Sequence, residues 1–134
     1  WSALRCALAA IPVMVEAGYG RIVLISNDSA HTGLDDHVID RGRTSLLTLV
    51  GDLSREYGPS GLTFNVLAPL VQSSGFERLK SEQPRLANRV LSGLPMGRPA
   101  ELAEVVAAVD YLTSREARLV NGLALGADAE WQPL

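Results

Sequence analysis

The sequence has no tyrosine and no lysine between Asp28 and Glu56, and Lys80 is the only lysine in the chain. Cys6 is the only cysteine, which excludes an internal disulfide framework and favours a reducing, cytoplasmic setting. No cluster of basic residues is present and the net charge is −3, so nucleic-acid binding is not expected. The apolar stretch near the N-terminus is too short for a membrane span and lacks the features of a signal peptide.

What remains is an ordinary globular composition. The 134 residues include 47% hydrophobic and 20% charged residues. That balance is typical of a folded chain, and the length suits one domain over residues 1–134. No repeat, low-complexity tract or linker divides it.

The first half of the chain alternates apolar helices and strands. Residues 1–17 predict a helix that is buried on more than one face. Residues 22–25 form a continuous β-branched and leucine run, which is typical of a strand buried on both faces of a parallel sheet. A helix over residues 38–57 has an apolar stripe, and residues 62–67 predict a second buried strand.

The second half continues the alternation. Residues 73–92 predict one or two short helices around Pro84, and Pro99 suits the first turn of a further helix. That helix is expected to bury Leu102, Val105, Val106, Val109 and Leu112. Residues 119–125 predict a last strand. Strands that alternate with helices indicate an α/β fold with a parallel sheet flanked by helices.

Five short stretches together resemble the short-chain dehydrogenase/reductase family. They read GRIVLIS, LSREY, GLTFNVLAP, GRPAELA and NG, and they begin at residues 20, 53, 61, 97 and 121. Each is weak alone, but their order and spacing match the family over nearly the whole chain. The resemblance implies a Rossmann-like fold, of which this chain is partial: the C-terminal half of a doubly wound sheet.

The family's N-terminal half carries the glycine-rich loop that holds the dinucleotide pyrophosphate. No such loop is found here, because Gly18 and Gly20 precede a strand and do not follow one. We therefore expect no cofactor in this chain alone, and NAD(P) if an upstream half exists. The first residue, Trp1, favours some truncation.

The resemblance also implies catalytic positions. In the family a tyrosine acts as general acid or base, a lysine lowers its pKa and binds the ribose, and a serine holds the substrate carbonyl. The tyrosine position falls on Ile39, which has no ionisable proton, and the lysine position falls on Arg43. Arg43 could still meet a ribose or phosphate through its charge. The serine position falls on Ser26 or Asn27.

Further cofactor contacts are implied at Pro69 and Ser74. Pro69 is followed by Leu70 where the family has a glycine, and a leucine there is expected to crowd the cofactor. Ser74 lies where the family often has a threonine that contacts the cofactor. It is equally suited to be the N-cap of a helix.

The loop after the first strand contains Asp28, His31, Asp35, Asp36 and His37. Carboxylates and imidazoles can bind metals, but this spacing matches no metal motif, and no metal is expected. A solvated loop is the favoured interpretation. The alternative is a repurposed, non-redox isomerase or cyclase with His31, His37 or a nearby carboxylate as its base.

The favoured hypothesis is a truncated, diverged relative of the family that lacks standard hydride transfer and acts through dimerisation or binding. The resemblance implies a homo-oligomer through helices 1–17 and 38–57. Strand 22–25 would lack a neighbour, so we expect its edge to be covered by an upstream segment, a second copy or a rearrangement. The alternative is part of an NAD(P)-dependent oxidoreductase whose cofactor-binding half is missing from this chain.

Overall fold

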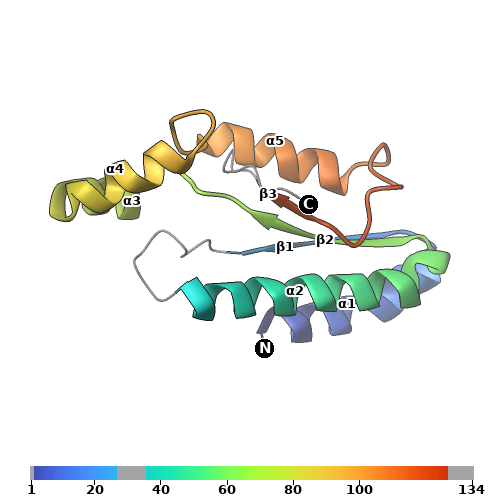
Figure 1. Cartoon of the computed structure of the whole chain (residues 1–134). Coiled ribbons are helices and arrows are strands. Elements are labelled where there is room, and N and C mark those ends of the chain that lie inside the picture. The colour runs from blue at the N-terminus through green and yellow to red at the C-terminus, as the bar shows by residue number, and fades with distance from the viewer. Residues whose placement is uncertain (1, 27–35, 127–134) are drawn as a thin grey trace.

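The computed structural model describes residues 2–26 and 36–126, with side chains described for 4–26 and 45–126. The elements are α1 (Ser2–Ala17), β1 (Gly20–Ile25), α2 (Asp36–Tyr57), η2 (Gly58–Ser60), β2 (Leu62–Ala68), α3 (Ser74–Glu82), α4 (Pro84–Gly93), α5 (Leu102–Thr113) and β3 (Ala124–Gly126). Figure 1 shows α1 and α2 on one face of the sheet and α5 on the other. Within the described residues, no helix has the length and apolarity needed to cross a membrane.

The sheet is parallel throughout, with strand order β1-β2-β3. β1 pairs with β2 from Gly20 opposite Leu62 to Ile25 opposite Leu67. β2 then pairs with β3, beginning at Val66 opposite Ala124. The predicted α/β architecture, a parallel sheet flanked by helices, is confirmed. β2 is central and buried along its whole length, as its continuous apolar sequence indicated.

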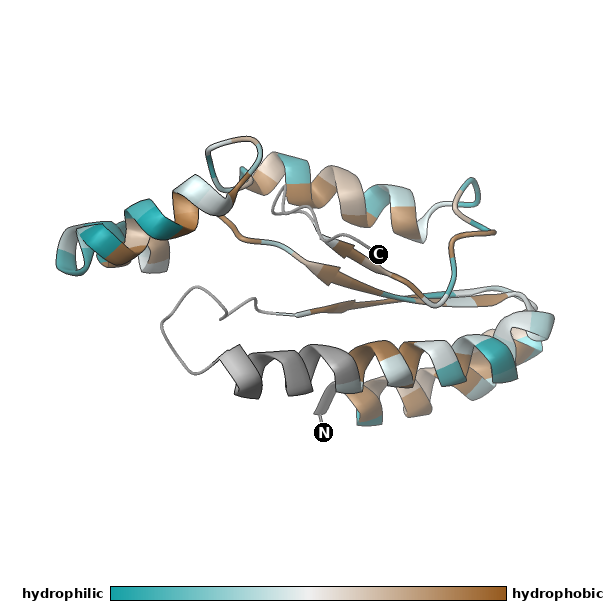
Figure 2. Cartoon of the chain, in the orientation of Figure 1, coloured by the Kyte–Doolittle hydropathy of each residue, from teal (hydrophilic) through white to brown (hydrophobic). Residues whose placement is uncertain are grey.

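Side chains from both faces of β2 organise the core. On one face, Phe64 and Val66 pack with Ile11 of α1 and with Val50 and Leu53 of α2. On the other face, Leu67 packs with Ala100 and Val105 at the start of α5. In Figure 2 brown, apolar segments of α2 lie against the sheet, whereas α1 is brown on its outer side as well. The α2 stripe predicted from the sequence therefore forms the main helix–sheet contact.

The strand predicted at residues 22–25 is not buried on both faces. β1 is an edge strand of the described sheet, its middle is only partly buried, and Ile25 is 63% exposed. The reason is positional, since an edge strand has a neighbour on one side only. Among the described residues no strand pairs with the outer edge of β1, and the predicted cover of this edge stays a prediction.

The prediction that the first helix is buried on more than one face is also wrong. Ala7 and Ile11 face the core, whereas Leu8, Val13 and Val15 are exposed. The helix covers the edge strand β1, and no further layer of the described chain lies against its outer side. Its second apolar face is therefore left open.

The helix expected to start at Pro99 begins at Leu102. Ala100 is held in an extended conformation beside β2, because its N–H donates to the Leu70 carbonyl at 2.8 Å and it forms a parallel bridge with Val71. Glu101 then caps the helix. Val105 and Leu112 are buried as expected, but Leu102 and Val106 are exposed because only one face of α5 meets the sheet.

The last strand is shorter than predicted. It covers only Ala124–Gly126, and Leu119 is 89% exposed. Before it, the Asn121 side chain takes the place of a strand backbone: its Oδ1 accepts from the Phe64 N–H at 2.8 Å, and its Nδ2 donates to the Leu62 carbonyl at 3.2 Å. Gly122 turns the chain with φ +77°.

α3 and α4 form a pair that projects beyond the sheet (Figure 1), as predicted around Pro84. The pair has its own small apolar core, made by Leu70, Phe76, Val90 and Leu94.

Candidate functional site

The candidate site lies where β1 and β2 end. The Ser26 N–H donates to the Leu67 carbonyl at 2.8 Å, which places Ser26 directly after β1 and beside the end of β2. Its side chain is half-buried. In open α/β sheets ligands bind beyond the carboxyl ends of the strands, so Ser26 has a suitable position. Asn27, the other candidate, lies outside the described residues.

The start of α2 lies at the same end of the molecule as the carboxyl end of β2 (Figure 1). α2 begins at Asp36, so Ile39 and Arg43 occupy its first two turns. Four residues apart on a helix, they share one face. Their side chains, and those of His31 and His37, lie outside the described ones. No group of three or more possible metal ligands comes together among the described residues.

The residues after β2 are placed differently from one another. Pro69 is buried at the end of the strand. The Leu70 side chain is 9% exposed and packs into the small core under α3 and α4, so it is not left in the open space beyond the strand. Ser74 is exposed in the first turn of α3. The N-cap is its neighbour Ser73, whose hydroxyl accepts from the Phe76 N–H at 3.3 Å.

All three tyrosines of the chain lie at the opposite end of the sheet, by the amino ends of the strands. Tyr19 precedes β1, and its hydroxyl donates to the Thr113 carbonyl at 2.9 Å. Tyr57 is the last residue of α2, with its ring 6.2 Å from that of Phe64. Tyr111 is in the last turn of α5. No tyrosine hydroxyl is therefore available where β1 and β2 end.

Tyr57, at the far end of α2, is too distant to act as a general acid at the candidate site. Tyr57 lies about 27 Å from Ile39, given a helical rise of 1.5 Å per residue. A hydrogen bond with Glu56 raises the pKa of Tyr57, which disfavours its phenolate further. Lys80, the single lysine, is on α3 and pairs with Glu77 at 3.1 Å. Neither member of a tyrosine–lysine pair is found at the candidate site.

Charged residues also shape the entrance to α5. The Arg98 guanidinium contacts both carboxylate oxygens of Glu104, at 2.7 and 2.8 Å. Glu104 also accepts from the Glu101 N–H at 2.8 Å. The hydrogen bond from Arg98 lowers the pKa of Glu104 to about 2. Within the GRPAELA stretch, Arg98, Glu101 and Glu104 therefore stabilise the start of α5.

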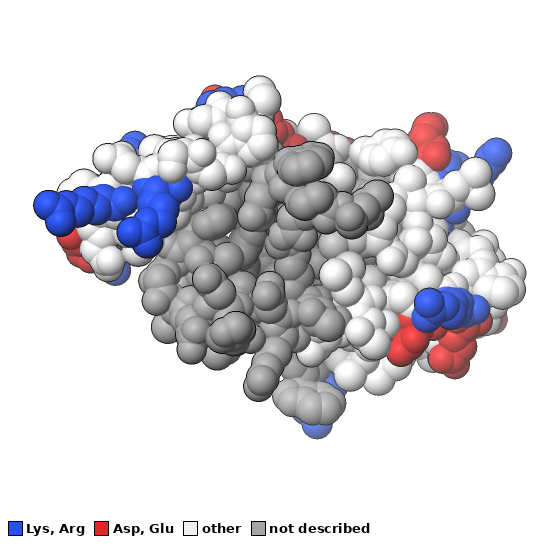
Figure 3. Space-filling view, in the orientation of Figure 1, with Lys and Arg blue, Asp and Glu red and all other residues white. Residues whose placement is uncertain are grey.

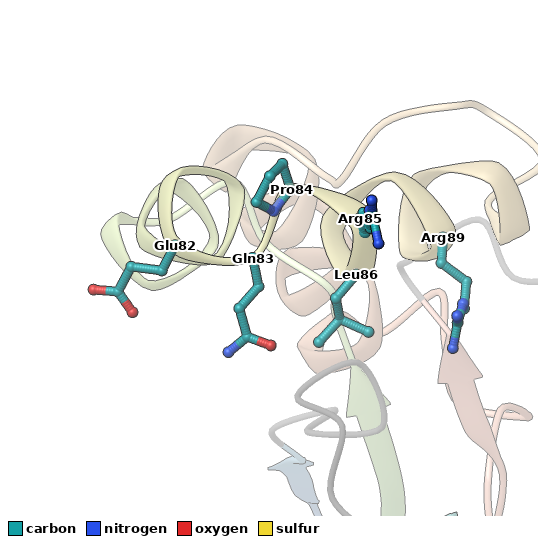
Figure 4. Close-up of a pocket in the computed structure, with 6 residues that line it drawn as sticks. All are labelled: Glu82, Gln83, Pro84, Arg85, Leu86 and Arg89. Carbon is teal, nitrogen blue, oxygen red and sulfur yellow. The ribbon is translucent and has the colours of Figure 1, made fainter.

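Sequence reasoning missed a hollow of about 510 Å³ at the junction of α3 and α4. Figure 4 shows the six residues that line it, which are Glu82, Gln83, Pro84, Arg85, Leu86 and Arg89. Lys and Arg atoms gather at this end of the molecule (Figure 3). The signal available in the sequence was the pair of arginines four residues apart.

A family model described as "Enoyl-(Acyl carrier protein) reductase" matches residues 1–129. The chain is 37% identical over 130 residues to 2,3-dihydroxy-2,3-dihydro-p-cumate dehydrogenase of Pseudomonas putida, covering 96% of this chain and 50% of that protein. The chain thus spans about half the length of this relative.

Solved structures of similar fold cover the same part of the chain. The TT0495 protein from Thermus thermophilus is similar with a TM-score of 0.82 and 30% identity, over 95% of this chain and 54% of that one. A 3-oxoacyl (acyl-carrier-protein) reductase from Agrobacterium tumefaciens C58 with NADP bound has a TM-score of 0.79 over 97% of this chain and 52% of that one. Its 21% identity supports the shared fold alone.

Proposed function

Since this chain belongs to the short-chain dehydrogenase/reductase family, we propose that it is a diverged member that acts through binding and dimerisation and does not perform hydride transfer by the family's tyrosine mechanism. The observation that carries this proposal is the separation of the tyrosines from the candidate site. The family resemblance assigns the tyrosine position to Ile39, and the three tyrosines present lie at the far end of the sheet.

Loss of a general acid alone slows a reaction by roughly 10² to 10⁴. Ile39 cannot donate or accept a proton, and Arg43 stays charged at any physiological pH. Arg43 keeps a cation near the start of α2, suited to a ribose or phosphate group but not to proton transfer. Ser26 or Asn27 would supply a polar group for a bound carbonyl. Together with Arg43 these residues are suited to bind a ligand, but none of them can act as the general acid that the family's tyrosine provides.

The exposed side of α1 supports dimerisation. Leu8, Pro12 and Val15 fall on one helical stripe, and all three are exposed. Leu47 adds a partly exposed apolar side chain from α2. Apolar patches of this kind mark contact surfaces more often than free ones. We propose a homodimer through α1 with a contribution from α2.

Light scattering after size exclusion at micromolar concentration tests the dimer. The unmodified chain should have twice the mass of its monomer, and Leu8→Glu with Val15→Glu should have the monomer mass. Leu119→Glu is the matched control, because Leu119 is also exposed but belongs to the segment between α5 and β3. A monomeric unmodified chain, or a control that dissociates equally, contradicts the interface.

The open edge of β1 supports a second contact. The Ser26 N–H points to β2, and bonding direction alternates along a strand, so Leu24 also bonds β2 while Val23 and Ile25 direct their N–H and C=O groups outward. Exposed edges of this kind invite strand pairing. We propose that an upstream segment or a partner covers this edge.

The second candidate function is a part of an NAD(P)-dependent oxidoreductase. It is favoured by the 37% identity to a dehydrogenase of which this chain covers 50%. Arg43, Pro69 and Ser74 would then contact the cofactor, whose pyrophosphate loop would come from outside this chain. Titration of NADPH fluorescence tests the first candidate. It predicts no saturation with this chain alone, so saturable binding would contradict it and favour the second.

A further inference from the structure

The hollow at the junction of α3 and α4 brings together two like charges on one helix. Arg85 and Arg89 are four residues apart on α4, so their side chains are neighbours on the helix surface. Two like charges at this spacing destabilise a helix. By contrast, Lys80 on α3 pairs with Glu77 in the stabilising sense. An anion placed between the two guanidinium groups would remove the repulsion on α4.

The hollow does not supply that anion itself. Among the described residues, neither Arg85 nor Arg89 forms an ion pair. Glu82 is the one carboxylate in the lining, and Figure 4 shows it at the opposite end from Arg89 and directed away from it. The positive charge of the hollow is therefore not neutralised by its own lining.

The space beside the arginines is apolar. Leu86 lies between Gln83 and Arg89, and the three side chains project from the same side of α4 (Figure 4). Pro84 adds a further apolar surface to the lining. A ligand that fits this combination has an apolar body and one anionic group. The amide of Gln83 offers both a donor and an acceptor at the rim.

The hollow also lies at the end of the molecule where ligands are expected. Figure 1 shows α4 beyond the carboxyl end of β2. Figure 4 shows the Leu86 and Arg89 side chains directed toward the strands. Ligands of open parallel sheets bind beyond those carboxyl ends. We propose that Arg85 and Arg89 form a binding site for a small organic carboxylate, with Leu86 against its apolar body. Two guanidinium forks are well suited to a carboxylate.

Titration of the full chain with three probes tests the ligand class. Sodium benzoate has the anionic group and the apolar body, benzamide lacks the charge, and inorganic phosphate lacks the apolar body. Ligand-observed NMR should show saturable benzoate binding, with benzamide and phosphate each at least about tenfold weaker. Absence of saturation with benzoate overturns the proposal. Equal binding of benzamide overturns the role of charge, and equal binding of phosphate overturns the role of the apolar body.

Variants then test the residues. Arg85→Gln and Arg89→Gln should each raise the Kd for benzoate roughly tenfold, and Arg89→Lys should fall between Arg89→Gln and the unmodified chain because it keeps the charge but loses the fork. Arg78→Gln on α3 is the control, because Arg78 is exposed and does not line the hollow. An unchanged Kd in both Gln variants overturns the site.

A benzoate titration of the unmodified chain, followed by the NMR chemical shifts of its backbone amides, tests the site without relying on the folding of any variant. Benzoate should shift the amides of residues 83–89, and shifts confined to another part of the chain would overturn the proposal. The result is separable from the function proposed above. A monomeric chain, or one that binds NADPH, would contradict that function without changing the benzoate titration.

Discussion

The Asn121 side chain accepts a hydrogen bond from the backbone N–H of Phe64 at 2.8 Å, in the place where a neighbouring strand would otherwise pair with β2. The same oxygen accepts from the Ser54 hydroxyl at 2.7 Å. One amide thus joins the central strand, α2 and the segment before β3. Phe64 is fully buried, so the backbone N–H that Asn121 satisfies has little access to water.

Replacement of this amide should destabilise the fold. Asn121→Ala leaves the Phe64 N–H without its partner, and an unsatisfied buried donor costs about 1–3 kcal/mol. Urea unfolding followed by circular dichroism should show that loss in the free energy of unfolding. Asn88→Ala, at an exposed position on α4, should change it by less than about 0.5 kcal/mol. Equal effects of the two changes would show that the Asn121 bonds contribute nothing specific.

The Arg98–Glu104 pair should make stability depend on pH in acid. Glu104 has a folded-state pKa of about 2, below its ordinary value of 4.5, because Arg98 hydrogen-bonds the carboxylate. The folded state therefore favours the ionised form. Its stabilisation is complete above pH 4.5 and is lost as pH falls toward 2.

Thermal unfolding between pH 5 and pH 2 measures this contribution. Glu104→Gln should flatten the decline of Tm in this window, because the group that takes up the proton is gone. Arg98→Gln should do the same by removing the cause of the lowered pKa. A decline as steep in both variants as in the unmodified chain would contradict the assignment.

A tyrosine introduced at Ile39 tests whether residues 39 and 43, the positions proposed to match the family's tyrosine and lysine, meet on α2. Arg43 is one turn further along α2, and a cation at that distance favours the phenolate. In Ile39→Tyr the new phenol should titrate with a pKa lower than in Ile39→Tyr with Arg43→Gln. Phenolate absorbance, taken as the difference from the unmodified chain, measures it. Identical titrations would show that the two side chains do not meet.

The edge of β1 can be examined by hydrogen exchange. Leu24 directs its N–H to β2, and Val23 and Ile25 direct theirs outward. If a partner or an upstream segment covers the edge, as proposed, all three amides should be protected to a similar degree. Rapid exchange at Val23 and Ile25 beside a protected Leu24, at micromolar concentration, would show the edge open.

Much of the fold was predictable because it depends on local signals. The continuous apolar run of β2 indicated a central strand, and Pro84 marked the break between α3 and α4. Burial of β1 and α1 was overestimated, since an apolar sequence does not reveal whether a neighbouring layer exists. The start of α5 depended on the Leu70–Ala100 hydrogen bond between distant segments, which no local pattern encodes.

The site was predicted less completely. Ser26 lies after β1, where its stretch indicated, and its role in a site stays a prediction. The cap at Ser73 in place of Ser74 depends on backbone angles that two adjacent serines do not distinguish. The α3–α4 hollow was missed because arginines four residues apart are also common on solvated helices. Only the fold showed that Leu86 and Gln83 lie beside them.

Val71 and Ala100 form an isolated parallel bridge just beyond the end of β2. The segment between them, which contains α3 and α4, therefore begins and ends at adjacent points of the fold. A segment with neighbouring ends can be lengthened, or replaced by a tight turn, while the strands keep their register.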